Sequence, residues 1–153
     1  MNGLIRFNSK GEFNNTVHHN RPGIHPDKLE GILLDWSDRI KGIDFVCGDY
    51  RTTTFSATKY DFVYLDPPYF GTTQMYYGKL EFEPFLDYLD ELNKHGVRFA
   101  LSYDGIRGNT NLCADIPKEL YKRHLLIDAG VSSFSRIVKK EREEVKESLY
   151  LNF

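Results

Sequence analysis

The sequence predicts a mixed α/β fold with a mostly parallel sheet whose last strand runs antiparallel. Short apolar runs that end in turn residues alternate with amphipathic helical patterns, as in βαβ proteins. The chain has 153 residues, of which 41% are hydrophobic and 27% charged, so it can bury a core and does not resemble a disordered chain. The last apolar run follows a hairpin-like basic segment instead of a crossover helix, which is why that strand is expected to be antiparallel.

Two main helices and five strands are expected. The first helix begins at Pro26, in the favoured first-turn position, and runs to residue 41 with an apolar stripe that assigns Trp36 to the core. The second helix, 81–95, is apolar on one face and is followed by Gly96, a typical C-cap. The expected strands are 43–47, 61–65, 97–102, 124–128 and 148–153.

The strand at 61–65 is followed at once by Asp66-Pro67-Pro68-Tyr69. Neither proline can donate to a sheet ladder, so Asp66 lies at the carboxyl end of the strand, where open α/β sheets place their ligand crevices. A carboxylate, the rigid carbonyl of Pro67 and the aromatic ring of Tyr69 together suit an exocyclic amino group on a planar base. The alternative interpretation is an ordinary proline turn with a solvated aspartate.

This stretch resembles motif IV, the DPPY motif, of the amino methyltransferases. The aspartate form is associated with adenine-N6 and some cytosine-N4 DNA enzymes. The resemblance implies a Rossmann-like methyltransferase core, S-adenosyl-L-methionine (SAM) as cofactor, and Asp66, Pro67 and Tyr69 as catalytic residues acting on a flipped base.

Residues 1–25 are polar and lack a sustained period, which is also typical of a plain loop with a short hairpin. Arg6-Phe7-Asn8, followed by Gly-Glu-Phe-Asn at 11–14, resembles the target-recognition signature of the D12 class (Dam-type) adenine-N6 DNA methyltransferases. The resemblance implies that Arg6 and Asn8 bind DNA. Arginine and asparagine side chains can both form hydrogen bonds with the edges of bases. The sequence departs from that signature at Asn15-Thr16, where the family usually has Val-Pro, so the recognition sequence stays open.

Asp49 and Tyr50 follow the predicted strand 43–47. An acidic-aromatic pair at this place lines the SAM adenine pocket in the D12 class, so the resemblance assigns Asp49 and Tyr50, together with Asp66, to cofactor binding. The other interpretation is a turn aspartate that precedes a polar loop.

The basic segment 132–140 contains Ser-Ser-Phe-x-Arg, which is similar to the tail of D12-class enzymes. Ser133 and Arg136 are therefore candidate DNA-binding residues. The alternative interpretation, which the sequence supports equally, is an exposed hairpin arm whose lysines are solvated. The glycine-flanked segment 71–78 is expected to be a mobile loop over the site.

The resemblance runs from about residue 2 to the C-terminus. It makes residues 1–25 part of a target-recognition region and residues 26–153 an incomplete catalytic core, because the Phe-x-Gly-Gly turn of these enzymes has no counterpart here. We therefore expect a partial methyltransferase sheet with a free edge at 61–65. The chain alone is expected to bind SAM weakly, and to self-associate or need a complementing N-terminal methyltransferase half.

The functional hypothesis is a restriction-modification enzyme, or its fragment, that methylates adenine N6 in double-stranded DNA. A non-catalytic DNA-binding or subunit-complementing remnant and a cytosine-N4 methyltransferase are the alternatives. The net charge of −2 requires any phosphate-binding surface to be local. No metal is expected, since the two cysteines are isolated and the histidines near the N-terminus lack further ligands at familiar spacing. Without a membrane span or signal-peptide pattern, a cytoplasmic protein is expected.

Overall fold

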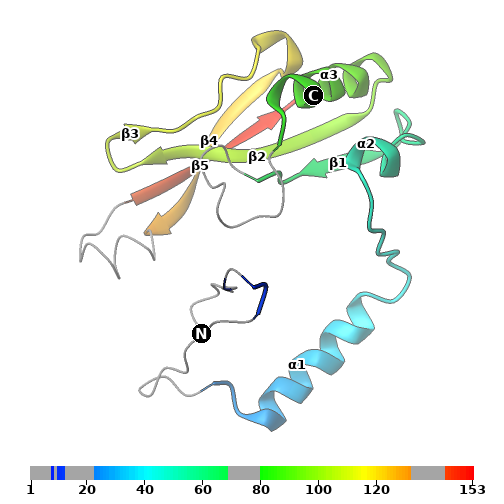
Figure 1. Ribbon diagram of the computed structural model, residues 1–153, viewed down its shortest axis with the longest axis vertical. Helices are drawn as coiled ribbons and strands as arrows, with labels where there is room; N and C mark the ends of the chain where they lie inside the picture. The colour runs from blue at the N-terminus through cyan, green and yellow to red at the C-terminus, as the bar shows by residue number, and fades with distance from the viewer. Residues whose placement is uncertain (1–7, 9, 13–22, 69–79, 132–143) are drawn as a thin grey trace. The chain divides into compact units, whose positions relative to one another are not determined.

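The computed structural model describes residues 8, 10–12, 23–68, 80–131 and 144–153 (Figure 1). The chain divides into two compact units, residues 1–47 and 48–153. The domain boundary predicted between residues 25 and 26 stays a prediction.

The first unit contains one helix, α1 (Pro26–Arg39), among its described residues. Proline opens the helix, and Asp35 pairs with Arg39 one turn later at 2.8 Å. No residue of α1 is buried, and Trp36 is 59% exposed, so its assignment to the core was wrong. An apolar stripe is buried only when a second surface covers it, and helical spacing alone does not supply that surface.

Residues 43–47 form no strand, so that prediction was wrong. Phe45 and Val46 are 78% and 73% exposed. A strand requires hydrogen bonds to a neighbouring strand, and no described residue pairs with this segment.

The second unit is built on one sheet in the order β1-β2-β5-β4 (Figure 1). These strands are β1 (Phe62–Leu65), β2 (Arg98–Arg107), β4 (Arg123–Val131) and β5 (Glu144–Leu151), and the short β3 (Thr110–Asn111) pairs with the end of β2. β1 is parallel to β2, whereas β5 is antiparallel to both β2 and β4. β1, β2 and β4 therefore point in one direction and β5 in the other, which confirms the predicted mixed sheet with its antiparallel C-terminal strand.

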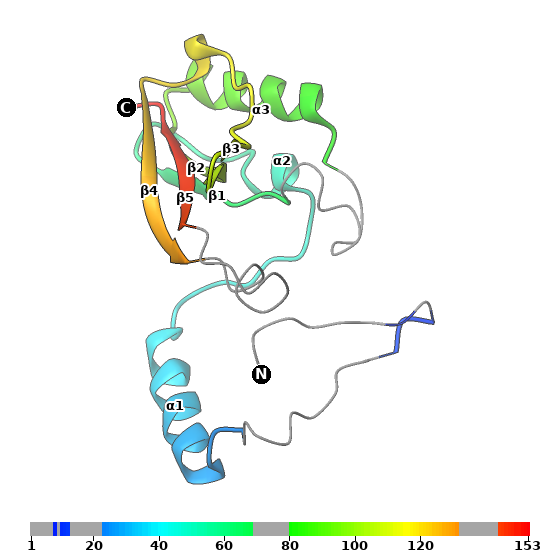
Figure 2. The same ribbon diagram turned by 90° about the vertical axis from the view of Figure 1, so that its left-hand side faces the viewer.

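Helix α3 (Phe82–Lys94) connects β1 to β2 and lies on one face of the sheet (Figure 2). Its buried Phe85, Leu89 and Leu92 belong to one cluster with Leu65 of β1. The cluster also contains alternate residues of β2, Tyr150 of β5 and side chains around the 3-10 helix η1 (Lys118–Leu120). Its remaining members are Tyr88, Val97, Phe99, Leu101, Tyr103, Ile116 and Leu120. This core holds the ends of β1 and β2 in place.

Asn152 joins three elements at the start of β2. Its Oδ1 accepts a 2.7 Å hydrogen bond from the backbone N–H of Phe99, and its Nδ2 donates to Val97 O and Asn93 Oδ1, both at 2.8 Å. Asn93 in turn donates to Leu120 O. The end of α3 is thereby tied to β2 and to the residue that follows β5.

The ladder between β2 and β5 is irregular between Tyr103 and Ile106. Gly105 lies in this bulge with its backbone against β5, so that a Cβ placed on it would stand 2.1 Å from the carbonyl oxygen of Lys146. The bulge lets β2 continue to Arg107, five residues beyond the predicted end of the strand at 102. Within the described part of the chain, no helix is long and apolar enough to cross a bilayer.

Candidate active site

Asp66 is the first residue after β1, and the sheet places it beside Ser102 of β2. The two parallel strands are paired in the register Leu65 with Leu101, so the next residue of each lies at the same edge. Ser102 Oγ donates a 2.9 Å hydrogen bond to Asp66 Oδ1 and lies 3.4 Å from the carbonyl oxygen of Leu65. Ser102 is only 5% exposed, whereas Asp66 is exposed and accessible to a substrate.

Pro67 and Pro68 follow as half-buried residues outside the ladder, and β1 ends at Leu65 as expected before them. Of the predicted catalytic residues, Asp66 and Pro67 are adjacent at the carboxyl end of a parallel strand. Tyr69 lies outside the described residues, as does the predicted loop 71–78.

Asp49 caps the amino end of the short helix α2 (Tyr50–Thr53) and pairs with Arg51. One carboxylate oxygen accepts from the backbone N–H and from Nε of Arg51, both at 2.9 Å, and the other accepts from Nη2 at 3.0 Å. The side-chain hydrogen bond from Arg51, followed by the backbone bond, holds the pKa of Asp49 below its ordinary value. The carboxylate stays exposed and has further lone pairs to offer to a ligand.

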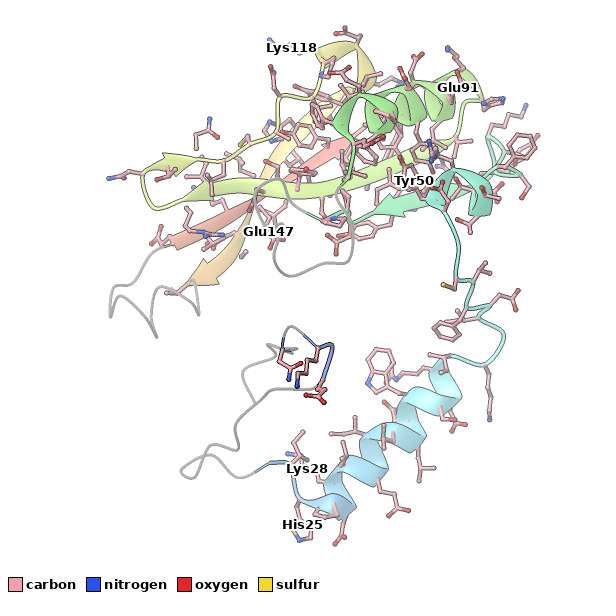
Figure 3. The ribbon with its side chains drawn as sticks, in the orientation of Figure 1. His25, Lys28, Tyr50, Glu91, Lys118 and Glu147 are labelled. Carbon is pink, nitrogen blue, oxygen red and sulfur yellow. The ribbon has the colours of Figure 1, made fainter. Side chains whose placement is uncertain are left out.

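Tyr50 projects from α2 toward α3 (Figure 3). Its ring meets Tyr88 edge-on with centroids 4.8 Å apart and Phe85 at 6.0 Å. Burial raises the pKa of the Tyr50 phenol. Thr54 joins the contact, because its Oγ1 lies 2.7 Å from Tyr88 Oη. Tyr50, one of the residues predicted to bind the cofactor, therefore packs against α3. The α3 residues that it contacts belong to the same core as Leu65 at the end of β1.

Two cavities lie beside these elements. One of about 240 Å³ opens past the end of the β2 core segment, between Phe82, Tyr103 and Asp104 and the segment 112–115. Burial raises the pKa of Asp104, an effect that Arg107 partly offsets. The other cavity, of about 410 Å³, lies between the α2 region and α3 and is lined by none of the predicted cofactor residues.

The residues predicted to bind DNA are mostly outside the described residues: Arg6, Ser133 and Arg136. Asn8 is described, and its side chain closes a turn. Its Oδ1 accepts from the backbone N–H groups of Lys10 and Glu12, each at 2.9 Å, and its Nδ2 donates to Glu12 Oε2. A base edge would therefore have to replace hydrogen bonds that Asn8 already makes.

The sequence analysis assigned no role to Ser102. Two signals could have found it: it is the first polar residue after the apolar run Phe99-Ala100-Leu101, and it is level with the end of the parallel strand β1. Within the described ranges, no group of three or more histidine, cysteine, aspartate or glutamate side chains could hold a metal ion.

A mixed α/β sheet with Asp-Pro-Pro at the end of a parallel strand, and with an exposed aspartate hydrogen-bonded to the neighbouring strand, fits the arrangement of an amino methyltransferase. The chain belongs to the family of D12 class N6 adenine-specific DNA methyltransferases, whose sequence profile matches residues 1–145.

Three relatives illustrate the match. The modification methylase StsI of Streptococcus sanguinis is 36% identical over 113 residues, which are 66% of this chain and 17% of that protein. The type II methyltransferase M.FokI of Planomicrobium okeanokoites is 31% identical over an alignment of 167 positions, covering this whole chain and 26% of that protein. The DNA adenine methylase of Serratia marcescens is 35% identical over 68 residues, which are 44% of this chain and 24% of that protein. The chain thus spans about a quarter or less of the length of these relatives.

Proposed function

We propose that this chain carries the base-binding and catalytic part of a DNA methyltransferase that transfers a methyl group from SAM to adenine N6. The observation that supports this most directly is the exposed Asp66 carboxylate, held at the end of β1 by the buried Ser102 and followed by Pro67. The relatives with modification and type II names favour a role in restriction-modification.

An adenine amino nitrogen is a poor nucleophile because its lone pair is delocalised into the ring. Hydrogen bonds from its two hydrogens to the Asp66 carboxylate and the Pro67 carbonyl draw the lone pair back onto the nitrogen and orient it for in-line attack. The amino proton becomes acidic only as the methyl group arrives, so Asp66 accepts it late in the step. Tyr69 gives the flipped base a stacking surface.

The residues around α2 fit the cofactor that this chemistry needs. Asp49 offers an exposed carboxylate that can accept from a hydroxyl or amino group, and Tyr50 offers an anchored aromatic ring. When bound, SAM supplies an electrophilic methyl group. Asp49, Tyr50 and Asp66 are the residues that would hold it.

The proposed substrate is double-stranded DNA with the target adenine flipped out, since N6 is out of reach inside a duplex. Arg6, Asn8, Ser133 and Arg136 are proposed to contact the DNA, and a cytoplasmic location follows from this substrate. β1 pairs with β2 and with no other strand of the described chain, and its Phe62 and Tyr64 are 52% and 61% exposed. We propose that its free edge receives a complementing methyltransferase segment or a second copy.

Asp66→Ala tests this function in the protein assayed together with the complementing methyltransferase half proposed above. We expect methyl transfer to fall by about 10²-fold or more, because an acceptor used in the transition state is lost, while DNA binding is retained. The matched control is Asp61→Ala, which removes an exposed aspartate at the other end of the same strand, where it only accepts hydrogen bonds from Thr58.

Mass spectrometry of the methylated nucleosides identifies the target atom. N6-methyladenine lost in Asp66→Ala and kept in Asp61→Ala supports the proposal. N4-methylcytosine as product would mean a cytosine enzyme. No methylation by the unaltered protein even when the complementing methyltransferase half is supplied, with DNA binding intact, would mean a non-catalytic DNA-binding module.

A further inference from the structure

The hydrogen bond between Ser102 and Asp66 has a role that the proposed function leaves open. We propose that Ser102 is a positioning residue for methyl transfer: its hydroxyl occupies Oδ1 of Asp66 and so leaves Oδ2 in a fixed orientation to accept from the target amino group. This inference rests on the proposed function, because it concerns the same carboxylate.

The first step of the argument is that an aspartate carboxylate does not orient itself. Rotation about its last side-chain bond is broad, unlike the rotation about a bond between two tetrahedral carbons. Asp66 is exposed and follows the last residue of β1, so the ladder restrains its backbone but not its carboxylate plane. A hydrogen-bond donor at a defined place is needed to orient that plane. Ser102 Oγ, which donates to Oδ1 at 2.9 Å, is such a donor.

The second step is that the sheet holds the backbone of Ser102 in place. It is 5% exposed, and it lies in the regular part of β2, where it is paired with Leu149 of β5. Its neighbours Leu101 and Tyr103 point the other way, into the core beneath α3, as alternation along a strand requires. The hydroxyl therefore has a fixed origin, and its described acceptors, Asp66 Oδ1 and Leu65 O, both belong to the end of β1.

The third step concerns what the donor leaves available. A carboxylate has about four acceptor positions on its two oxygens, and a hydroxyl occupies one of them. Because the serine is neutral, it orients the carboxylate without neutralising its charge. The second oxygen keeps its full capacity to accept from an amino hydrogen. A mispositioned acceptor costs rate even where binding is unchanged, since catalytic geometry tolerates little displacement.

The test uses two comparisons in the full-length protein. Ser102→Ala removes the hydroxyl, and Ser148→Ala is the matched control. Ser148 is also fully buried and in the same sheet, but its Oγ bonds to His124 Nε2 and Cys113 Sγ instead of Asp66. The second comparison is Ser102→Thr with Ser102→Val, which have the same shape and differ in the hydroxyl. It decides the question even if the alanine variant does not fold.

We expect kcat to fall about 10- to 100-fold in Ser102→Ala and Ser102→Val, the size of a lost hydrogen bond to a charged group, with KM for DNA nearly unchanged. Ser102→Thr should be faster than Ser102→Val by a similar factor, and Ser148→Ala should keep kcat. Independently of activity, the side-chain carboxyl ¹³C resonance of Asp66 should shift in Ser102→Ala and Ser102→Val only.

Equal rates for the threonine and valine variants, or an unmoved Asp66 resonance in the valine variant, would overturn the positioning role. These outcomes are distinct from failure of the proposed function. If Asp66→Ala abolishes methylation but the Ser102 variants do not alter kcat, the function stands and the positioning role is wrong. If Asp66→Ala itself methylates normally, the proposed function is wrong.

Discussion

Replacing Gly105 with alanine should break the sheet at the bulge of β2. The new Cβ would lie 2.1 Å from Lys146 O and 2.9 Å from both Lys146 C and Ser148 N. All three are backbone atoms of β5, so no side-chain rotation can relieve the contact. The carbonyl oxygen alone would have to withdraw by 0.9 Å to reach 3.0 Å, the distance below which such contacts are essentially never seen.

Such a displacement separates β2 from β5 where Ile106 pairs with Lys146 and Arg107 with Val145. Overpacking typically costs about 1–3 kcal/mol, and each lost ladder hydrogen bond adds about 1 kcal/mol. We therefore expect Gly105→Ala to lower the free energy of unfolding by about 2–4 kcal/mol.

Urea denaturation followed by circular dichroism measures this change, because circular dichroism reports directly on the strands of the sheet. Gly31→Ala in α1 is the control, since a Cβ there meets nothing within 4 Å. It should stabilise the helix by up to about 1 kcal/mol. A loss below about 0.5 kcal/mol in Gly105→Ala, within the range of ordinary surface substitutions, would refute the steric argument.

Two other predictions concern the ends of the same sheet. Asn152→Ala should cost about 2–4 kcal/mol of unfolding free energy in the same urea assay, because it leaves the buried N–H of Phe99 and the carbonyl of Val97 without their partner. Asn152→Asp keeps the acceptor but loses the donor, so a near-wild-type Asn152→Asp would contradict this account. The free edge of β1 predicts that the 153-residue chain self-associates or needs a complementing polypeptide, and that it binds SAM weakly alone. Light scattering and isothermal titration check this, and tight SAM binding by a monomer would contradict it.

Most helices and strands of the second unit were predicted from local sequence patterns. Helix 81–95 and the strands at 61–65, 97–102 and 148–153 have counterparts in the structure that contribute apolar residues to one shared core. The strand at 124–128 also has a counterpart, β4, but its residues are exposed and it is formed by its pairing with β5. Asp66 was placed at the end of the strand for a local reason, because the two prolines that follow it cannot donate hydrogen bonds to a sheet ladder.

The errors arise where structure depends on a partner. The run at 43–47 has the composition of a strand, but composition does not supply a neighbour to pair with. The predicted strand ended at Ser102 because Asp104-Gly105 is a typical turn signal. In the structure Gly105 lies in a bulge instead, and β2 continues beyond it. The contact between Ser102 and Asp66 joins residues that are 36 positions apart, so no local pattern contains it.

A serine is better suited than a cation to the place beside Asp66. An arginine or lysine at residue 102 would bind the carboxylate more strongly, but it would occupy more acceptor positions and oppose the negative charge that attracts the amino hydrogens. The position is also 5% exposed, where an unmatched cation would be costly to bury. A short neutral side chain on an inner strand can donate one hydrogen bond to the carboxylate and leave its second oxygen available to the substrate. In the proposed mechanism the acceptor geometry is set by β1 and β2, two strands of the core, so that an exposed carboxylate can still have a defined orientation.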